Sequence, residues 1–408
     1  MINRQPQIRF WGFNDDWEQR KCEGILKPIK GAMKIGPFGS ALKKEFYTET
    51  GVKVYAQENI FQEDFTIGDY YISEERYQTL KGCKLEPGDL VISMMGTIGA
   101  CAIFPNNAEP GIMNSHLLRL QLNDDIYPEY IHQLLRDSQI IRSQIDRLSV
   151  GSIMSGLSSS VVQKLIFPIP SLDEQKKIAE FLTQLDKTIT LHQRKCDKLI
   201  NIKKSMLEKM FPQKGEKTPE IRFSGFTDDW EQRKFGDVGS VAMCKRIFKE
   251  QTSEEGDVPF YKIGTFGGTP DAYISRELFE EYKKAYQYPN KGDILISASG
   301  SIGRTVEYTG EDEYFQDSNI VWLKHGDIID NAFLKVLYSV VEWSCEGSTI
   351  KRLYNDNFLK TEFMLPYIEE QTKIGELFSQ IDNLITLHQR KLEKLIIIKK
   401  SMLEKMFV

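Results

Sequence analysis

The chain has 408 residues, of which 41% are hydrophobic and 11% aromatic, and this composition is typical of a globular protein with two or three domains. Its 58 acidic and 53 basic side chains give a formal net charge of −5, which argues against a protein that grips nucleic acid without local basic patches or partners. No apolar run reaches the roughly 20 residues of a membrane span, and residues 1–8 contain no signal-peptide core, so we expect a cytoplasmic protein. The six cysteines form no CxxC pair, which indicates neither a zinc ribbon nor a disulfide framework.

The start of the chain is repeated in its middle. The block Ile8–Lys21 (IRFWGFNDDWEQRK) recurs 213 residues later as Ile221–Lys234 (IRFSGFTDDWEQRK), with differences only at its fourth and seventh positions. An internal repeat of this length indicates two halves with the same structural plan.

The segments inside the two halves share sparser landmarks, each 204 residues apart. Gly88–Ser93 corresponds to Gly292–Ser297, and Gly96–Gly99 corresponds to Gly300–Gly303. The first landmark is an apolar run rich in β-branched residues, the second is a Gly-containing turn, and another apolar run follows each turn. This order predicts a strand, a turn and a second strand in each half.

A long helix is predicted at the end of each half. Over Leu172–Phe211 the seam positions recur in an unbroken 4-3 spacing, whose average of about 3.5 residues keeps one seam facing a partner helix, and the same steps recur 196 residues later. Acidic residues at Asp173–Gln175 and Glu369–Gln371 suit the positive N-terminal ends of these helices. At about 1.5 Å per residue, each helix would be about 60 Å long. The seam positions are Ile178, Leu182, Leu185, Ile189, His192, Cys196, Leu199, Lys203, Met206 and Met210, then Ile374, Phe378, Ile381, Ile385, His388, Leu392, Leu395, Lys399, Met402 and Met406.

The two seams match position by position, including their polar members. His192 corresponds to His388, and Lys203 corresponds to Lys399. Polar residues in a coiled-coil seam fix register or orientation at some cost in stability, so we interpret both pairs as register devices. Lone helical histidines are more often structural than metal-binding, and no metal-ligand pattern surrounds these two. Two equal helices attached to equal domains pair most economically in an antiparallel coiled coil, which would place the domains at opposite ends.

These features predict an α+β fold class: two globular α/β-type domains separated by two long helices in an antiparallel coiled coil, with a pseudo-twofold internal repeat. The Pro-containing stretches before each helix should be extended, because the residue before proline avoids the helical region. Pro212 ends the first helix, and a polar linker follows it. The predicted divisions are an N-terminal repeat segment (1–21), a first globular domain (22–171), a central long helix (172–211), a linker and repeat segment (212–234), a second globular domain (235–367) and a C-terminal long helix (368–408).

Common enzyme motifs are missing from the sequence. It has no adjacent prolines, which excludes the Asn/Asp-Pro-Pro-aromatic motif of amino-group methyltransferases, and it has neither GxGxxG nor GxxxxGK[ST]. Asp271 followed by Glu281 and Lys283 has the outline of a nuclease site in which two carboxylates hold Mg²⁺ and a lysine orients water. This pattern is short, has no counterpart in the first half, and lies in what reads as a solvated charged turn or helix. We therefore predict no catalytic residues and no metal site.

The inner segments are rich in side chains that can contact DNA, namely Ser, Thr, Asn, Gln, Lys and Arg near glycines and turns. Lys and Arg would mainly neutralise phosphates, and Asn, Gln and Ser would discriminate between bases. The Gly-rich loops Gly36–Ser40 and Gly264–Thr269 suit close backbone approach to a ligand, although tight turns at the edge of a sheet explain them equally well. The candidates are Lys34, Phe38, Ser40, Lys43, Lys44, Gln57, Asn59, Thr97, Asn114, Ser115 and His116 in the first half, and Lys245, Arg246, Lys249, Lys262, Thr265, Ser299, Arg304, Gln316, Asp317, Ser318, Asn319, Lys351 and Arg352 in the second.

Over essentially its whole length the chain resembles the specificity subunit of a type I restriction-modification system. The resemblance rests on the doubled Ile-Arg-Phe-x-Gly-Phe-x-Asp-Asp-Trp-Glu block and on the doubled Gly-Asp-(Leu/Ile)-(Val/Leu)-Ile-Ser and Gly-(Thr/Ser)-Ile-Gly pair. It also rests on the Pro-x-x-x-Glu-Gln-x-x-Ile entry to each helix (170–178 and 366–374) and on Ile-Thr-Leu-His-Gln-Arg-Lys (189–195 and 385–391). Each motif is weak alone, and together they are specific.

The resemblance implies a subunit that is not itself an enzyme. Each globular domain would be a target-recognition domain that reads one half of a split, asymmetric DNA site in the major groove, and the paired helices would act as a ruler and as a docking surface. The expected partners are double-stranded DNA, two methyltransferase subunits that bring S-adenosylmethionine, and restriction subunits that use ATP and Mg²⁺, with no cofactor on this chain. Two unlike reading domains on a rigid spacer would read half-sites separated by on the order of one helical turn. The alternative, which the acidic net charge favours, is a coiled-coil scaffold that joins protein partners without DNA specificity.

Overall fold

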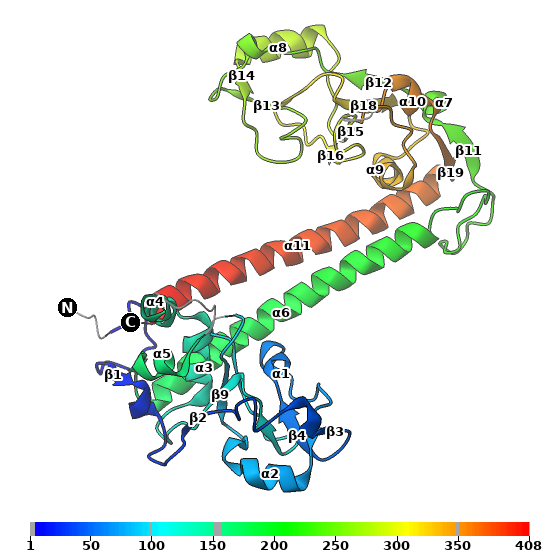
Figure 1. Cartoon of the computed structure of the whole chain (residues 1–408). Helices are drawn as coiled ribbons and strands as arrows, with labels where there is room; N and C mark the ends of the chain where they lie inside the picture. Colours follow the sequence, from blue (N-terminus) through cyan, green and yellow to red (C-terminus); the bar gives the residue numbers. More distant parts are fainter. Residues whose placement is uncertain (1–4, 98, 150–156, 348–350, 408) are drawn as a thin grey trace. The chain divides into compact units, whose positions relative to one another are not determined.

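The computed structural model describes residues 5–97, 99–149, 157–347 and 351–407, so Ile98 of the predicted turn lies outside the described residues. The chain divides into two compact units, which we call unit 1 (Met1–His192 and Lys391–Val408) and unit 2 (Gln193–Arg390). Two long helices, α6 (Leu172–Lys209) and α11 (Ile368–Met406), each contribute a part to both units (Figure 1).

Unit 1 contains two four-stranded sheets that pack face to face. The large sheet has the order β2 (Met33–Ile35), β9 (Leu117–Leu120), β6 (Leu90–Ser93) and β7 (Cys101–Ile103), and all of its pairs are antiparallel. The small sheet has the order β3 (Tyr47–Thr48), β5 (Tyr71–Ile72), β4 (Val52–Tyr55) and β8 (Gly111–Met113), and its β4–β8 pair is parallel. Strand β6 is buried on both faces, because Val91 belongs to the core between the sheets whereas Leu90 and Ile92 belong to a second core.

Helices cover the other face of the large sheet and complete that second core. They are α3 (Pro128–Asp137), α4 (Gln139–Leu148) and α5 (Ser159–Lys164). Helix α1 (Gln57–Phe61) follows β4 of the small sheet and contacts β6 and β7 of the large one, and α2 (Glu74–Leu80) follows β5 (Figure 1). Pro128 occupies the first position of α3, where a backbone N–H has no helical partner to lose. The last turn of α11 joins the same core through Met406 and Phe407. A two-stranded ribbon of β1 (Glu18–Lys21) and β10 (Ile166–Ile169) leads into α6.

Unit 2 repeats this plan. Its large sheet has the order β12 (Gly239–Met243), β18 (Ile320–His325), β15 (Ile294–Ser297) and β16 (Thr305–Glu307), and its small sheet has the order β14 (Tyr273–Ile274), β13 (Val258–Tyr261) and β17 (Tyr314–Phe315). The helices are α7 (Phe235–Val238), α8 (Arg276–Ala285), α9 (Asn331–Val340) and α10 (Asn355–Lys360), and β11 (Glu231–Lys234) pairs with β19 (Glu362–Leu365). The predicted fold class is confirmed: helix and sheet are mixed, the domain is repeated, and the two long helices are present.

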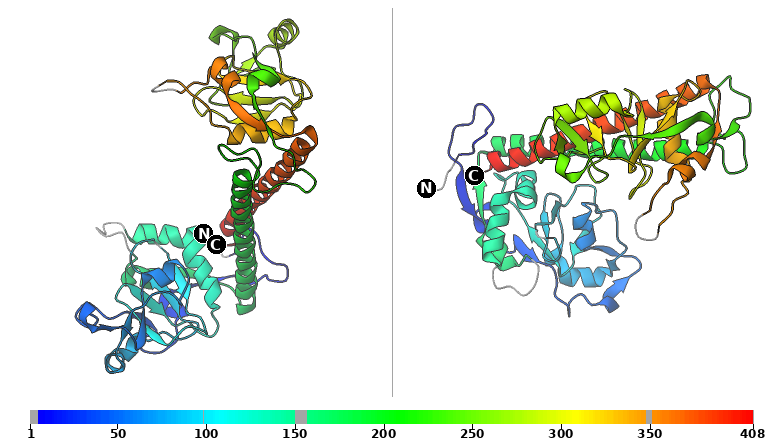
Figure 2. Two further views of the ribbon diagram at one scale, coloured as in Figure 1. Left: turned by 90° about the vertical axis from the view of Figure 1, so that its right-hand side faces the viewer. Right: turned by 90° about the horizontal axis from the view of Figure 1, so that it is seen from above.

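The repeated N-terminal block joins the two long helices in unit 1. The backbone N–H of Ile8 donates to the carbonyl oxygen of Lys405 at 3.0 Å, near the end of α11. The guanidinium of Arg9 donates to both carboxylate oxygens of Glu174, at 2.7 and 2.8 Å, in the first turn of α6. Residues near both ends of the chain therefore lie side by side in this unit (Figure 2).

Unit 2 contains the same arrangement with the helices exchanged. Ile221 donates to the carbonyl of Lys209 near the end of α6 at 2.9 Å, and Arg222 donates to Glu370 in the first turn of α11 at 2.7 and 2.8 Å. In each unit the end of one long helix thus meets the start of the other, so the helices run antiparallel there. The doubled Arg and Glu of the sequence motifs form this clamp.

The seam residues of both long helices are buried or half-buried, whereas most of their neighbours are exposed. The two seam lysines make equivalent ion pairs between the helices: Lys203 lies 2.6 Å from Asp382 in unit 2, and Lys399 lies 2.7 Å from Asp186 in unit 1. The two pairs are related by the internal repeat: Lys399 lies 196 residues after Lys203, and Asp382 lies 196 residues after Asp186. The seam lysines therefore bind a partner at a fixed position along the other helix.

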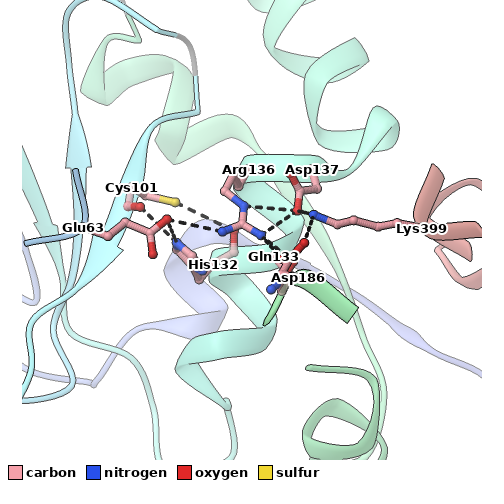
Figure 3. Close-up of polar contacts among 8 residues, drawn as sticks. All are labelled: Glu63, Cys101, His132, Gln133, Arg136, Asp137, Asp186 and Lys399. Atoms are coloured by element: carbon pink, nitrogen blue, oxygen red, sulfur yellow. Dashed lines mark hydrogen bonds and ion pairs between the residues drawn. The ribbon is translucent and has the colours of Figure 1, made fainter. Parts of the chain in front are cut away.

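A larger polar network surrounds Lys399 in unit 1 (Figure 3). Arg136 donates to Asp137 at 2.9 Å and to Asp186 at 2.5 Å, and Lys399 donates to Asp137 at 2.9 Å. The buried ring of His132 lies 3.0 Å from the carbonyl of Cys101, and its burial lowers the pKa of the imidazole. The network links α3 to both long helices.

Unit 2 has no equivalent of the Arg136–Asp137 pair. Tyr127 and Asp330 are equivalent, because each donates its backbone N–H to the matching helix glutamine at 2.9 Å. Counting along α3 and α9 from these residues places Ser339 and Val340 where unit 1 has Arg136 and Asp137. The first domain is therefore attached to the helices by charged contacts that have no counterpart at the equivalent positions of α9, Ser339 and Val340, in the described part of unit 2.

Among the helices in the described part of the chain, none combines the length and the apolar composition that a bilayer crossing requires.

Candidate nucleic-acid interface

In unit 1, loops that follow several strands meet at one edge of the two sheets. Gly36, directly after β2, donates its N–H to Leu117 at 3.0 Å, and a Cβ at this glycine would lie 1.8 Å from the carbonyl oxygen of Asn114. Met94, directly after β6, donates to His116 at 2.8 Å. The side chain of Gln57 at the start of α1 donates to the carbonyl of Met95 at 3.3 Å. The close approach at residue 36 thus requires glycine and brings these loops together.

We call the predicted residues on these loops rim 1: Phe38, Ser40, Gln57, Thr97, Asn114, Ser115 and His116. Phe38 is 70% exposed, Ser40, Thr97 and His116 are exposed, and the other three are half-buried. Lys34 lies on β2 beside a hollow of about 490 Å³ that Phe38, Thr79 and Gly82 also line. Rim 1 therefore presents amide, hydroxyl, imidazole and aromatic groups to solvent with little positive charge.

Three first-half candidates lie elsewhere or have another role. Asn59 is 1% exposed, and its amide bonds to the backbone of Ala56, Asp64 and Ile67 at 2.8 to 3.1 Å, so it shapes the turn after α1 instead of facing a ligand. Lys43 and Lys44 lie at a short 3₁₀ turn (Lys44–Phe46) before the edge strand β3, and Lys43 pairs with Glu45 at 3.5 Å.

In unit 2, the equivalent loops bring most second-half candidates together. Ala298 donates to Asn319 at 2.8 Å, Gln316 accepts from Ile263 at 2.8 Å, and Gly300 donates to Lys351 at 3.2 Å. We call the predicted residues on these loops rim 2: Lys245, Arg246, Lys262, Thr265, Arg304, Gln316, Asp317, Ser318, Asn319, Lys351 and Arg352. Ser299 is only 7% exposed and forms a backbone bridge to Arg352, and Lys249 lies on a separate 3₁₀ turn (Lys249–Gln251).

Rim 2 is more basic than rim 1 although the whole chain is acidic. Lys245, Arg246, Arg304, Lys351 and Arg352 are all exposed. The Arg304 guanidinium lies 5.4 Å from the centre of the Phe266 ring and donates to the carbonyl of Ile263 at 2.7 Å, which holds its charge at the surface. A group of cations on one edge is what phosphate contacts require.

The sequence did not identify two residues beside rim 2. Tyr286 and Gln287 follow α8 and line a hollow of about 330 Å³ together with Lys245, Arg246 and Asp317. The ammonium of Lys245 lies 4.9 Å from the centre of the Tyr286 ring. The signal in the sequence was an aromatic residue two positions after a pair of lysines near a helix end, which is too common to select a site.

The nuclease pattern is not assembled in the structure. Asp271 forms an ion pair with Lys262 at 2.8 Å, and Lys283 donates to Asp312 at 3.2 Å, while Glu281 is exposed on α8. Among the described residues, no three His, Cys, Asp or Glu side chains are placed to hold a metal ion. Burial raises the pKa of Cys22 and of Cys244 to about 12, so both thiols stay protonated at neutral pH.

Comparisons with known proteins show which family the chain resembles. The family model described as "Type I restriction modification DNA specificity domain" matches residues 14–201 and 227–396. A Haemophilus influenzae sequence described as a type I restriction enzyme specificity subunit is 43% identical over 237 residues, which are 57% of this chain and 60% of that relative. The sequence described as the type I restriction enzyme MjaX specificity subunit of Methanocaldococcus jannaschii is 24% identical and aligns over 95% of this chain and 92% of its own length.

One solved structure shares the fold over the whole chain. The crystal structure of the S subunit of a type I restriction-modification system from M. genitalium has a TM-score of 0.60 and 15% identity, and the match covers 99% of both chains.

Proposed function

This chain belongs to the family of type I restriction-modification DNA specificity domains, and we propose that it is the non-catalytic subunit that reads DNA sequence in such a system. Rim 1 and rim 2 would each read one half of a bipartite, asymmetric DNA site. The large sheets of the two domains have the same strand order and the rims lie on equivalent loops, but the rims carry unlike side chains. This combination supports two reading domains for two unlike half-sites.

The long helices would set the distance between the half-sites and bind the partner subunits. Exposed leucines at repeat-equivalent positions support a docking surface used twice: Leu191 is 50% exposed and Leu387 is 46% exposed, and 196 residues separate them. Two copies of one partner would fit such a repeated surface. By family resemblance these are methyltransferase subunits that carry S-adenosylmethionine, joined by restriction subunits that use ATP and Mg²⁺. Work on cellular DNA implies a cytoplasmic location.

The first test is the methylation pattern. We expect co-expression with a methyltransferase subunit of the same system to methylate a single bipartite motif, detected by sequencing modified bases. Exchange of residues 22–165 for the same segment of another family member should change one half of the motif only. A change in both halves, or in neither, would contradict the assignment of one half-site to each domain.

The second test separates DNA recognition from a scaffold role. Binding of the assembled complex to DNA should weaken steeply with salt, because each phosphate contact contributes about −0.9 to the slope of log K against log salt. A scaffold without DNA contacts predicts no such slope and no methylation motif, and none of the relatives or structural matches supports it.

A further inference from the structure

Strand pairing aligns the two rims residue by residue, which sequence comparison cannot do. Three residues lie side by side across each large sheet: Ile92, Leu118 and Ile35 in unit 1, and Ile296, Val321 and Met243 in unit 2. Ile92 and Ile296 are equivalent in the repeated motif, so the end of β2 corresponds to the end of β12. Counting three residues onward makes Phe38 the equivalent of Arg246.

The same alignment pairs the loops that precede β9 and β18. Leu118 corresponds to Val321, so Asn114 corresponds to Asp317 four residues earlier. At the same place on the two scaffolds, unit 1 therefore has an exposed aromatic beside an amide, and unit 2 has an arginine beside a carboxylate. The two domains differ in chemistry at one matched position.

In unit 2 these two residues bind each other in a specific way. The Nε of Arg246 donates to Oδ2 of Asp317 at 2.8 Å. The arginine side chain is 60% exposed and the aspartate side chain 17% exposed. Among the described residues, no hydrogen bond or ion pair engages either terminal nitrogen of Arg246. The guanidinium is thus held through its Nε, while its two terminal N–H₂ groups face solvent.

The loop that holds Asp317 is itself anchored. Gln316 donates its backbone N–H to Tyr261 at 2.9 Å, and its side chain accepts from Ile263 at 2.8 Å. Ser318 has a φ of 28°, a left-handed conformation that a residue with a side chain rarely adopts. The carboxylate therefore sits on a constrained turn and orients the arginine.

From this geometry we propose that Arg246 reads a guanine in the half-site of unit 2, with Asp317 as its positioning residue. A planar guanidinium with two free N–H₂ groups matches O6 and N7 of guanine in the major groove, and no other base edge offers two acceptors in this arrangement. The inference rests on the proposed function. It also assigns base discrimination to an arginine, whereas the sequence suggested that arginines would contact phosphates.

The equivalent position in unit 1 cannot read guanine in this way. Phe38 has no donors, and the Oδ1 of Asn114 accepts from the backbone of His116 at 3.0 Å. Rim 1 and rim 2 should therefore differ in base preference at this matched position, which gives an internal control within one chain.

The test uses the complex with its methyltransferase subunits. Exchange of residues 235–367 first assigns one half of the methylation motif to unit 2. We then expect Arg246→Ala, which removes every side-chain donor, to accept any base at one guanine of that half and to leave the other half unchanged. Lys249→Ala, an exposed cation of the same unit outside rim 2, is the control and should leave the motif unchanged.

A binding measurement with modified DNA identifies the contact itself. Replacing that guanine by 7-deazaguanine, which lacks the N7 acceptor, should weaken binding of the wild-type complex by about 5- to 150-fold. The same replacement should have little effect on the Arg246→Ala complex. Asp317→Asn should reduce discrimination at this base pair only.

Three results would overturn the inference. They are a unit 2 half-site without guanine, a motif that stays sharp in Arg246→Ala, and wild-type binding that ignores 7-deazaguanine while Arg246→Ala weakens binding equally on all sequences, which would make Arg246 a phosphate contact. Failure of the proposed function looks different, because the wild-type complex would then methylate no bipartite motif.

Discussion

The clamp between Arg9 and Glu174 allows a quantitative test of how the fold is held together. Both carboxylate oxygens of Glu174 accept hydrogen bonds from Arg9. The Glu174 side chain is 1% exposed and the Arg9 side chain is 13% exposed. Arg9→Ala would leave a buried carboxylate without its partner, a change that typically costs about 3–5 kcal/mol. The N-terminal end of α6 would recover at most about 1 kcal/mol by stabilising the lone negative charge. We therefore expect a net loss of roughly 3 kcal/mol, a large part of the about 5–15 kcal/mol that holds a typical domain folded.

The assay is unfolding of the purified chain in guanidinium chloride, followed by tryptophan fluorescence. Trp17 reports on unit 1 because it is 1% exposed and lies in the same core as Ile178 and Leu182 of α6. Glu174→Ala and the double variant complete a double-mutant cycle, in which we expect a coupling energy of about 1–3 kcal/mol.

The control is Arg20→Ala. Arg20 makes an equally short contact with Asp125, at 2.6 Å, but the aspartate side chain is 53% exposed, so its loss should cost only about 0–1 kcal/mol. Arg222→Ala tests the matching clamp of unit 2, where the distances to Glu370 are the same. If Arg9→Ala were no more costly than Arg20→Ala, burial would not be what makes the clamp strong, and the reasoning would be wrong.

Three further predictions concern acid stability, the helices and DNA affinity. Burial lowers the pKa of His132, so the unfolded chain binds a proton near pH 6.5 while the folded chain resists it. Stability should therefore fall as the pH drops below about 6.5, and His132→Gln should flatten this part of a melting-temperature profile, whereas the exposed His116→Gln should not. Insertion of four residues near Lys187 disturbs the seam and should change the spacer of the methylation motif or abolish assembly, and an unchanged spacer would show that the helices are not the ruler. Arg304→Ala should weaken binding about equally on all DNA sequences and reduce the salt slope by about 0.9, and an unchanged slope would exclude a phosphate contact.

The long helices were predictable from the sequence, because the spacing of their apolar residues repeats within a few turns of a single helix. The 4-3 spacing from Ile178 to Met210 needs only one helix to be visible, and the structure places its members in a buried or half-buried row. The clamp was not predictable in the same way, since Arg9 and Glu174 are 165 residues apart. Arg9 and Glu174 each occur in a motif that is repeated in the second half, as Arg222 and Glu370, which indicates that both belong to the shared fold. The repeat does not show that the two side chains touch.

The candidate interface was predictable only in part, for two physical reasons. Composition cannot separate an exposed amide from a buried one, so Asn59 was selected with Asn114 although it is 1% exposed and serves the backbone. The inner segments are also too different for sequence alignment, and only the pairing of β9 and β18 with their neighbours equates Phe38 with Arg246. The cations of rim 2 come together only when the strands pair. The equivalence of Phe38 and Arg246 also depends on that pairing, so the sequence alone shows neither.

The unit 1 network tests how independent a recognition domain is of the helices that carry it. The Lys399–Asp186 pair has an exact counterpart in the Lys203–Asp382 pair of unit 2, so it belongs to the shared scaffold, whereas Arg136 and Asp137 belong to the first domain alone. Replacing both by the residues of unit 2, in Arg136→Ser/Asp137→Val, removes a positive and a negative charge together and leaves the scaffold pair in place.

We expect the Arg136→Ser/Asp137→Val variant to lose less than about 2 kcal/mol in the same denaturation assay, because no buried charge is left without a partner. Asp137→Val alone should cost more than the double variant, since Arg136 and Lys399 would then share the carboxylate of Asp186, and the other partner of Arg136, Glu63, is half exposed at 48%. If the double variant were as unstable as Arg9→Ala, the charged contacts would be essential to the first domain. Exchange of whole domains between family members would then require these two residues to be kept.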